Sequence, residues 1–187
     1  MKPVVVLDKI METADRLFYE QGYNLTGINQ IIEEAGISKP SLYNHFSSKS
    51  ELLLAYLDRI YDRWFDGLEE FSKDITDPFD RLIAIFDYRI GRQIKSNYGG
   101  CHWNKISAEM PKDEIDVLER TAKFKNNLKA HVFELVKQMN RPKDRLLNDD
   151  ELAETVFLQL EGGLILTYIT KSHQSLENAK EIVRKLV

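Results

Sequence analysis

Hydrophobic residues recur every three or four positions along almost the whole chain, a spacing that places them on one face of a helix. No segment shows the sustained period of two that would indicate a strand. The pattern therefore predicts an all-α fold of about nine helices. They are expected at about residues 7–22, 26–35, 38–46, 48–71, 78–95, 101–110, 114–140, 151–171 and 176–187.

The stretch 26–46 is typical of two short helices joined by a tight turn. Thr26 can cap the first helix, and Gly36 ends it because glycine adopts the left-handed backbone conformation at low cost. Ser38 is expected to cap the second helix, with Pro40 in its first turn, where a missing N–H costs nothing. The inward apolar residues are Ile28, Ile31, Ile32 and Ala35, then Leu42 and Phe46. This spacing predicts a helix-turn-helix, although αα-hairpins of other helical proteins share it.

In a helix-turn-helix the second helix enters the major groove of DNA, where each base pair displays a distinct set of donors and acceptors. The side chains left facing outward here are short, polar and able to donate. Pro40, Ser41, Tyr43 and Asn44 form this outer set, with Lys39 and His45 at its margins. Tyr43 and Lys49 suit phosphate oxygens.

The segment AGISKPSLYNHFSSKSELLLAYL, preceded by LDKIMETADRLFYEQGYNLTGINQII, resembles the DNA-binding domain of the tetracycline-repressor (TetR/AcrR) family. The likeness runs from about residue 7 to about residue 57. Its motifs are Phe18, Gly22 and Tyr23 closing the first helix, Thr26 opening the second, Ala35-Gly36-Ile37-Ser38, and Leu42-Tyr43-x-x-Phe46-x-x-Lys49.

This resemblance implies a two-domain, all-α, homodimeric transcriptional regulator, usually a repressor released by a small molecule. The DNA-binding domain would span 5–65, with its recognition motif at 27–46, and an effector-binding and dimerisation domain would span 66–187. By resemblance, Lys39, Pro40, Ser41, Tyr43 and His45 fall on the recognition helix, and Thr26 and Lys49 at helix starts that contact phosphate. A two-fold dimer in turn predicts a palindromic operator in double-stranded DNA.

Composition agrees with a folded cytoplasmic protein. The chain is 43% apolar and 30% charged, and its single cysteine, Cys101, cannot form an internal disulfide. The longest apolar run, 162–169, is less than half of the roughly 20 residues needed to span a bilayer. No membrane contact is therefore expected. The net charge of −4 argues against a non-specific nucleic-acid binder, so positive charge must act locally.

The helix expected at 151–171 is apolar on nearly all sides, which indicates burial on most of its surface. Gly162 and Gly163 weaken its middle, and the close approach of another helix would compensate. We expect the last two helices to pair with their copies in a second chain, although a purely intramolecular core is the alternative. The predicted dimer residues are Leu158, Gly162, Ile165, Leu166, Ile169, Ile182 and Leu186.

By resemblance, the effector binds among the central helices of the second domain. Aromatic walls with a few convergent polar groups are typical of small-molecule sites, and an arginine there could hold a carboxylate or phenolate. The alternative is that the aromatic residues are core and the arginines solvated. The candidates are Phe86, Tyr88, Arg89, Arg92, Trp103, Ile106, Met110, Phe124 and Tyr168.

Enzymes and small-molecule carriers are two alternatives to a regulator. The sequence contains no nucleotide-binding, nucleophile-elbow or zinc-protease motif, and its four histidines are scattered, so catalysis, a metal site and a cofactor are not expected. A helical small-molecule carrier or adaptor without DNA function is the other alternative. Such a protein would have no reason to expose Lys39, Ser41, Tyr43 and Lys49 around a turn.

Overall fold

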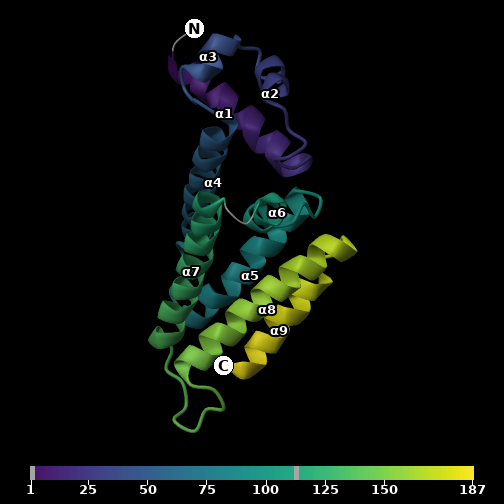
Figure 1. The fold of residues 1–187 in the computed structure, drawn as a ribbon. Helices are drawn as coiled ribbons and strands as arrows, with labels where there is room; N and C mark the ends of the chain where they lie inside the picture. Colours follow the sequence, from purple (N-terminus) through teal and green to yellow (C-terminus); the bar gives the residue numbers. More distant parts are fainter. Residues whose placement is uncertain (1–2, 112–113) are drawn as a thin grey trace. The chain divides into compact units, whose positions relative to one another are not determined.

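The computed structural model describes residues 3–111 and 114–187, and over these residues the chain forms nine α-helices and no strand (Figure 1). This confirms the predicted all-α fold. The helices are α1 (Pro3–Glu20), α2 (Ile28–Glu34), α3 (Lys39–Tyr43), α4 (Lys49–Ser72), α5 (Pro78–Lys95), α6 (His102–Glu109), α7 (Ile115–Gln138), α8 (Asp149–Thr170) and α9 (Gln174–Leu186).

Three helix ends follow the sequence signals. The Ser38 hydroxyl accepts from the backbone N–H of Ser41 at 3.2 Å before α3. The Asp77 carboxylate accepts from the N–H of Asp80 at 3.0 Å before α5. Gly36 has a φ of 61°, the left-handed conformation expected of a glycine after a helix.

Two helix starts differ from the prediction. Helix α1 begins at Pro3 rather than near residue 7. Helix α8 begins at Asp149, because Asn148 and Glu151 form a capping box: Asn148 accepts from the N–H of Glu151 at 3.0 Å, and Glu151 accepts from the N–H of Asn148 at 2.9 Å. This N-x-x-E signal was present in the loop that we expected before the helix.

The described helices group into two compact units. Unit 1 comprises Met1–Arg63 and His102–Thr121, and unit 2 comprises Trp64–Cys101 and Ala122–Val187. Helices α4 and α7 contribute residues to both units. Helix α6 belongs to unit 1, whereas the sequence-based boundary near residue 65 assigned it to the second domain; that boundary stays a prediction.

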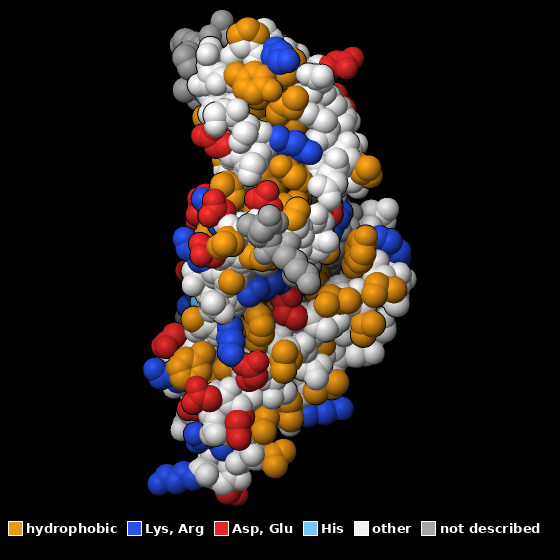
Figure 2. Space-filling model, viewed as in Figure 1, with side chains coloured by type: hydrophobic (Ala, Val, Ile, Leu, Met, Phe, Trp, Pro, Cys, Tyr) orange, Lys and Arg blue, Asp and Glu red, His pale blue; other side chains and the backbone are white. Residues whose placement is uncertain are grey.

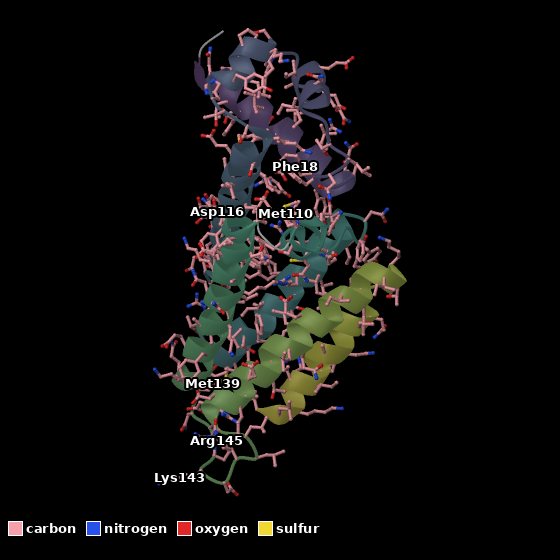
Figure 3. The ribbon with its side chains drawn as sticks, viewed as in Figure 1. Phe18, Met110, Asp116, Met139, Lys143 and Arg145 are labelled. Carbon is pink, nitrogen blue, oxygen red and sulfur yellow. The ribbon has the colours of Figure 1, made fainter. Side chains whose placement is uncertain are left out.

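Unit 1 is built around Phe18 of α1, which is buried and is labelled in Figure 3. Its ring centroid lies 5.4 Å from that of Tyr23 and 5.4 Å from that of Tyr56. Inclined aromatic pairs of this kind add about 0.5–1.5 kcal/mol each to the stability gained from burial. Ile31 of α2 and Leu42 of α3 are also fully buried, so all three N-terminal helices contribute to the core.

Unit 2 contains α8 and α9, which lie side by side, with α5 in contact with both (Figure 1). A Cβ atom on Gly163 would lie 3.0 Å from the Leu176 side chain and 3.3 Å from the Ser175 carbonyl oxygen. Glycine at this position therefore lets α8 and α9 approach closely. The approach predicted for the glycine pair is thus found at Gly163 within one chain, while Gly162 faces open space.

Helix α8 is apolar on nearly all sides, as expected. Among the described helices, α8 is the one whose length and composition would allow it to cross a membrane. In its most apolar 18-residue stretch, 39% is buried inside the protein. Core helices of soluble proteins meet the same criterion. Seven of its residues face the interior of unit 2: Leu152, Ala153, Val156, Leu160, Gly163, Leu164 and Thr167.

The loop that connects α7 to α8 is rich in basic residues. Its two ends are held together by Arg141. Arg141 contacts the Asp149 carboxylate at 2.8 Å and donates to the Leu147 carbonyl oxygen at 2.8 Å. Lys143 and Arg145 lie further along this loop (Figure 3). A buried arginine side chain thereby ties the start of the loop to its end.

The first prediction concerns acid sensitivity. Burial, reinforced by the charge of Arg81 and opposed by Glu69, holds the pKa of His131 below its ordinary value of 6.5. The unfolded chain binds this proton more readily, so the free energy of unfolding should fall as the pH drops below about 6.5. His131→Gln should reduce this loss, as measured by urea unfolding at pH 7.0 and about 5.5.

Equal pH dependence in His131→Gln and the wild type would contradict this assignment.

Candidate nucleic-acid interface

Helix α3 is short and exposes one polar face. Leu42 is fully buried and fixes the rotation of the helix about its axis. Lys39, Pro40, Tyr43 and Asn44 are exposed, and Ser41 and His45 are partly exposed. The structure therefore leaves these six predicted DNA-binding residues accessible on α3 and just after it.

The polar side chains of this surface can donate hydrogen bonds. Helix α3 has no acidic residue, and the Lys39 ammonium lies 6.0 Å from the centre of the Tyr43 ring. The hydroxyl groups of Ser38 and Ser41 are 2.8 Å apart. Lysine, tyrosine and serine can all donate to phosphate oxygens or to acceptor atoms on base edges.

Thr26 is placed differently from the prediction. The residue before α2 is Gly27, which makes no side-chain cap, so the predicted capping role of Thr26 is wrong. Thr26 is fully buried, and its hydroxyl donates to the Gly22 carbonyl oxygen at 2.6 Å and accepts from the Gln21 amide at 3.2 Å. The Thr26 hydroxyl has both of these partners inside the fold, and the phosphate contact expected at this helix start stays a prediction.

Lys49 begins α4 and lies over an aromatic ring. Its ammonium is 4.0 Å from the centre of the Tyr23 ring, within the range of a cation–π interaction. Burial lowers the pKa of Lys49, and the charge of Glu109 partly opposes this effect. The phosphate contact of Lys49 stays a prediction, and Glu109 would compete with phosphate for the same charge.

Helix α6 is attached to the end of α1 and the turn that follows it. Glu109 accepts from the Asn24 backbone N–H at 2.8 Å, and its carbonyl oxygen accepts from the Asn24 amide at 3.0 Å. Lys105 donates to the Tyr19 carbonyl oxygen. The His102 ring stacks on that of Tyr19, with centroids 4.0 Å apart. These contacts form a clamp between α6 and the DNA-binding helices, which sequence analysis did not identify.

The predicted effector residues divide between the two units. Trp103, Ile106 and Met110 belong to unit 1, where Trp103 and Ile106 are buried, and Met110 follows α6 (Figure 3). The other six belong to unit 2: Phe86, Tyr88, Arg89, Arg92, Phe124 and Tyr168.

Three of the unit 2 candidates, Tyr88, Arg89 and Phe124, lie beside Trp64 in an aromatic cluster. The Trp64 ring centroid is 5.2 Å from that of Phe124 and 5.7 Å from that of Tyr88. Arg92 donates to the Tyr88 hydroxyl at 3.1 Å. Phe86 is fully buried, whereas Tyr168 is exposed.

Arg89 is buried beside this cluster and is paired with a residue that sequence analysis missed. Its guanidinium contacts the Glu161 carboxylate at 3.3 Å, and Lys125 contacts the other oxygen of Glu161 at 2.5 Å. The Lys125 ammonium also lies 3.6 Å from the Cys101 sulfur. A signal for this cluster was available, because Glu161 is the sole charged residue between Thr155 and Thr170.

A separate open groove of about 770 Å³ lies between α7 and the start of α8. No predicted effector residue lines it. Its walls combine apolar and charged side chains: Asn126, Lys129, Ala130, Phe133, Leu147, Asp150, Glu151, Ala153, Glu154 and Thr155.

The predicted dimer residues lie on the surface of the single chain. Hydrophobic side chains are exposed along α8, as Figure 2 shows. Leu158, Ile165, Leu166 and Ile169 on α8 and Ile182 on α9 are exposed, Gly162 faces open space, and Leu186 is partly exposed.

The comparison with known protein families decides the identity of the N-terminal helices. Residues 10–56, from α1 into α4, match the model of the bacterial regulatory proteins of the tetR family. This N-terminal segment belongs to the TetR family. The exposed helix α3 lies within the matched segment, which agrees with its predicted place as the recognition helix of a TetR domain.

Curated relatives and solved structures agree with this TetR assignment. The HTH-type transcriptional activator FasR of Mycolicibacterium smegmatis is 41% identical over 79 residues, which cover 42% of this chain and 36% of FasR. An uncharacterized HTH-type transcriptional regulator of Lactococcus lactis is 28% identical over 95% of this chain and 90% of its own length. A TetR-family regulator from Agrobacterium tumefaciens shares the fold, with a TM-score of 0.85, 20% identity and full coverage of both chains.

The second prediction concerns two glycines that flank the turn between α1 and α2 of the TetR domain. Gly22 has a φ of 92°, and a Cβ atom there would overlap the Glu109 carboxylate. Gly27 has a φ of −85° and no neighbouring atom within 4 Å. Gly22→Ala should therefore lower the free energy of unfolding by about 1–3 kcal/mol, measured by urea titration.

The matched variant Gly27→Ala should change stability by less than about 1 kcal/mol. If both variants were equally stable, the attachment of α6 beside Gly22 would be incorrect.

Proposed function

We propose that this protein is a cytoplasmic, homodimeric transcriptional regulator that binds a palindromic operator and is released from it by a small-molecule effector. The observation that carries this proposal is the exposed donor face of α3 inside a segment that matches the TetR family. In this proposal Lys39, Pro40, Ser41, Tyr43, Asn44 and His45 face the major groove, and Lys49 contacts phosphate. The default direction of regulation is repression.

The exposed apolar face of α8 supports the dimer. Four large hydrophobic side chains on one helix are costly to leave in water, and patches of this kind mark interfaces. Gly162, in the middle of this face, would let the α8 helix of a second copy approach closely. The two copies of α3 would then read half-sites about one DNA turn apart, roughly 34–36 Å.

The clamp formed by α6 supports a route for release. Ligand binding would shift α6, and its contacts to Asn24 and Tyr19 would carry that shift to the DNA-binding helices. A differential affinity of about 1–3 kcal/mol between the two states is sufficient for such coupling.

A helical carrier without DNA function would need the same ligand site but not the outward face of α3. Operator binding therefore separates the two proposals. No cofactor or metal is part of either one.

The third prediction tests the recognition helix. Tyr43 is 44% exposed, so its removal should leave the buried core of unit 1 in place. Tyr43→Ala should weaken binding to the operator by roughly tenfold or more, because a lost base or phosphate contact is worth about 1–3 kcal/mol. Fluorescence anisotropy with DNA from upstream of the gene measures this change.

Phe71→Ala, which removes an aromatic ring of similar exposure from unit 2, should keep wild-type affinity for DNA. Both variants should unfold at the wild-type urea concentration. Unchanged operator affinity in Tyr43→Ala would remove α3 as the reading element.

The fourth prediction tests the dimer. Ile165 on α8 is 49% exposed in the single chain, so Ile165→Arg should not disturb the fold. An arginine at a buried interface would be left desolvated and unpaired, so the variant should sediment as a monomer at micromolar concentration.

Ile94 on α5 is 50% exposed and lies outside the proposed interface, so Ile94→Arg should remain a dimer. If Ile165→Arg still sediments as a dimer, the interface does not include this face of α8.

A further inference from the structure

The cluster of Arg89, Lys125 and Glu161 in unit 2 places two cations around one anion. The side chains of Arg89, Lys125 and Glu161 are 5%, 18% and 16% exposed, so all three are largely removed from water. Each cation contacts a different oxygen of Glu161. The group therefore carries an excess positive charge in a place where charge is costly to bury.

Arg89 retains unused capacity to donate. Its Nε atom is buried and has no hydrogen-bond partner among the described residues. An unsatisfied donor in the interior costs about 1–3 kcal/mol, and more for a charged group. A ligand oxygen that accepted this hydrogen would recover that loss.

Each of the two cations lies beside an aromatic ring. The Arg89 guanidinium lies 5.3 Å from the centre of the Trp64 ring, and the Lys125 ammonium lies 5.7 Å from the centre of the Phe124 ring. Trp64 and Phe124 are themselves packed edge to face. Flat apolar walls beside fixed donors suit an aromatic molecule that carries an acidic oxygen.

We propose that this cluster recognises the effector, and that the effector is a small aromatic anion whose carboxylate or phenolate oxygen binds Arg89 and Lys125. This inference rests on the proposed function and specifies the chemical class of its ligand. Trp64 and Phe124 contact the aromatic part of the ligand. Lys125, the more exposed of the two cations, is the first group that an entering anion meets.

Glu161 acts as the internal counter-ion when no effector is bound. The entering oxygen competes with the Glu161 carboxylate for the same two cations, so binding exchanges one anion for another instead of desolvating free cations. Glu161 is therefore a positioning residue that weakens effector affinity while it keeps the empty site folded. A neutral ligand would gain neither the charge-assisted hydrogen bonds nor this exchange.

The test uses the full-length protein and pairs of probes that differ in charge. The carboxylates benzoate, 2-naphthoate and 4-phenylbenzoate are titrated beside their neutral primary amides. The chain has two tryptophans, so a Trp103→Phe background leaves Trp64 as the fluorescent reporter at the cluster. We expect at least one carboxylate to change Trp64 fluorescence and to bind roughly tenfold more tightly than its amide.

Variants of the cluster should shift affinity in opposite directions. Lys125→Met should weaken carboxylate binding by roughly tenfold, and Glu161→Gln should strengthen it, while the amides should respond to neither change. Lys129→Met is the matched control, because Lys129 lies on the same helix and pairs with Glu154 outside the cluster. It should bind every probe as the background protein does.

Two results would overturn the proposal: no carboxylate binding below about 1 mM even in Glu161→Gln, or equal affinities for a carboxylate and its amide. Operator binding, measured on the same variants without ligand, is a separate readout. Intact operator binding with no charge preference would reject the anionic effector and leave the regulator proposal standing. Selective carboxylate binding by a protein that ignores every operator fragment would instead favour a carrier.

Discussion

A helix of five residues has little stability of its own in water, because forming the first helical turn fixes several residues for very few hydrogen bonds. Helix α3 depends on Leu42, which is fully buried, and on Phe46, which is nearly so just beyond its end. These two apolar anchors also fix the rotation of the helix. The outward direction of Lys39 and Tyr43 is thus a consequence of which residues are buried.

The ionic cluster of unit 2 follows a different logic. Apolar side chains could fill the space beside Trp64 at lower cost, since a buried ion pair seldom stabilises a fold more than well-packed hydrophobic residues do. Glu161 nevertheless interrupts an apolar helix, and the Nε atom of Arg89 has no hydrogen-bond partner in the part of the chain that the structure describes. Such local departures from favourable packing are typical of functional positions.

The sequence predicted those features that depend on neighbouring residues. Ser38, Gly36 and Asp77 each act at the end of a single helix, through residues close to them in sequence. Their roles could therefore be predicted from the sequence and are confirmed. Thr26 was misassigned because its hydroxyl is satisfied by Gly22 and Gln21, which lie in the preceding turn. A local signal cannot tell which of several nearby partners is chosen.

Contacts between segments far apart in the sequence could not be predicted from local patterns. Asn24 and Glu109 are 85 positions apart, and neither residue type signals the other. Gly163 was recognisable in the sequence because glycine weakens a helix. That α9 is the helix packed against it could be learned only from the fold. The division of the effector candidates between two units could not be predicted either, because α6 was assigned by its place in the chain.

The attachment of α6 relies partly on main-chain groups. Lys105 binds the carbonyl oxygen of Tyr19, and Glu109 binds the N–H of Asn24. Every amino acid offers that carbonyl oxygen, and every one except proline offers that N–H. During evolution, substitutions on the adjoining helices can therefore accumulate without detaching α6, so that the sequence read on DNA can diverge while the mechanical connection is inherited unchanged.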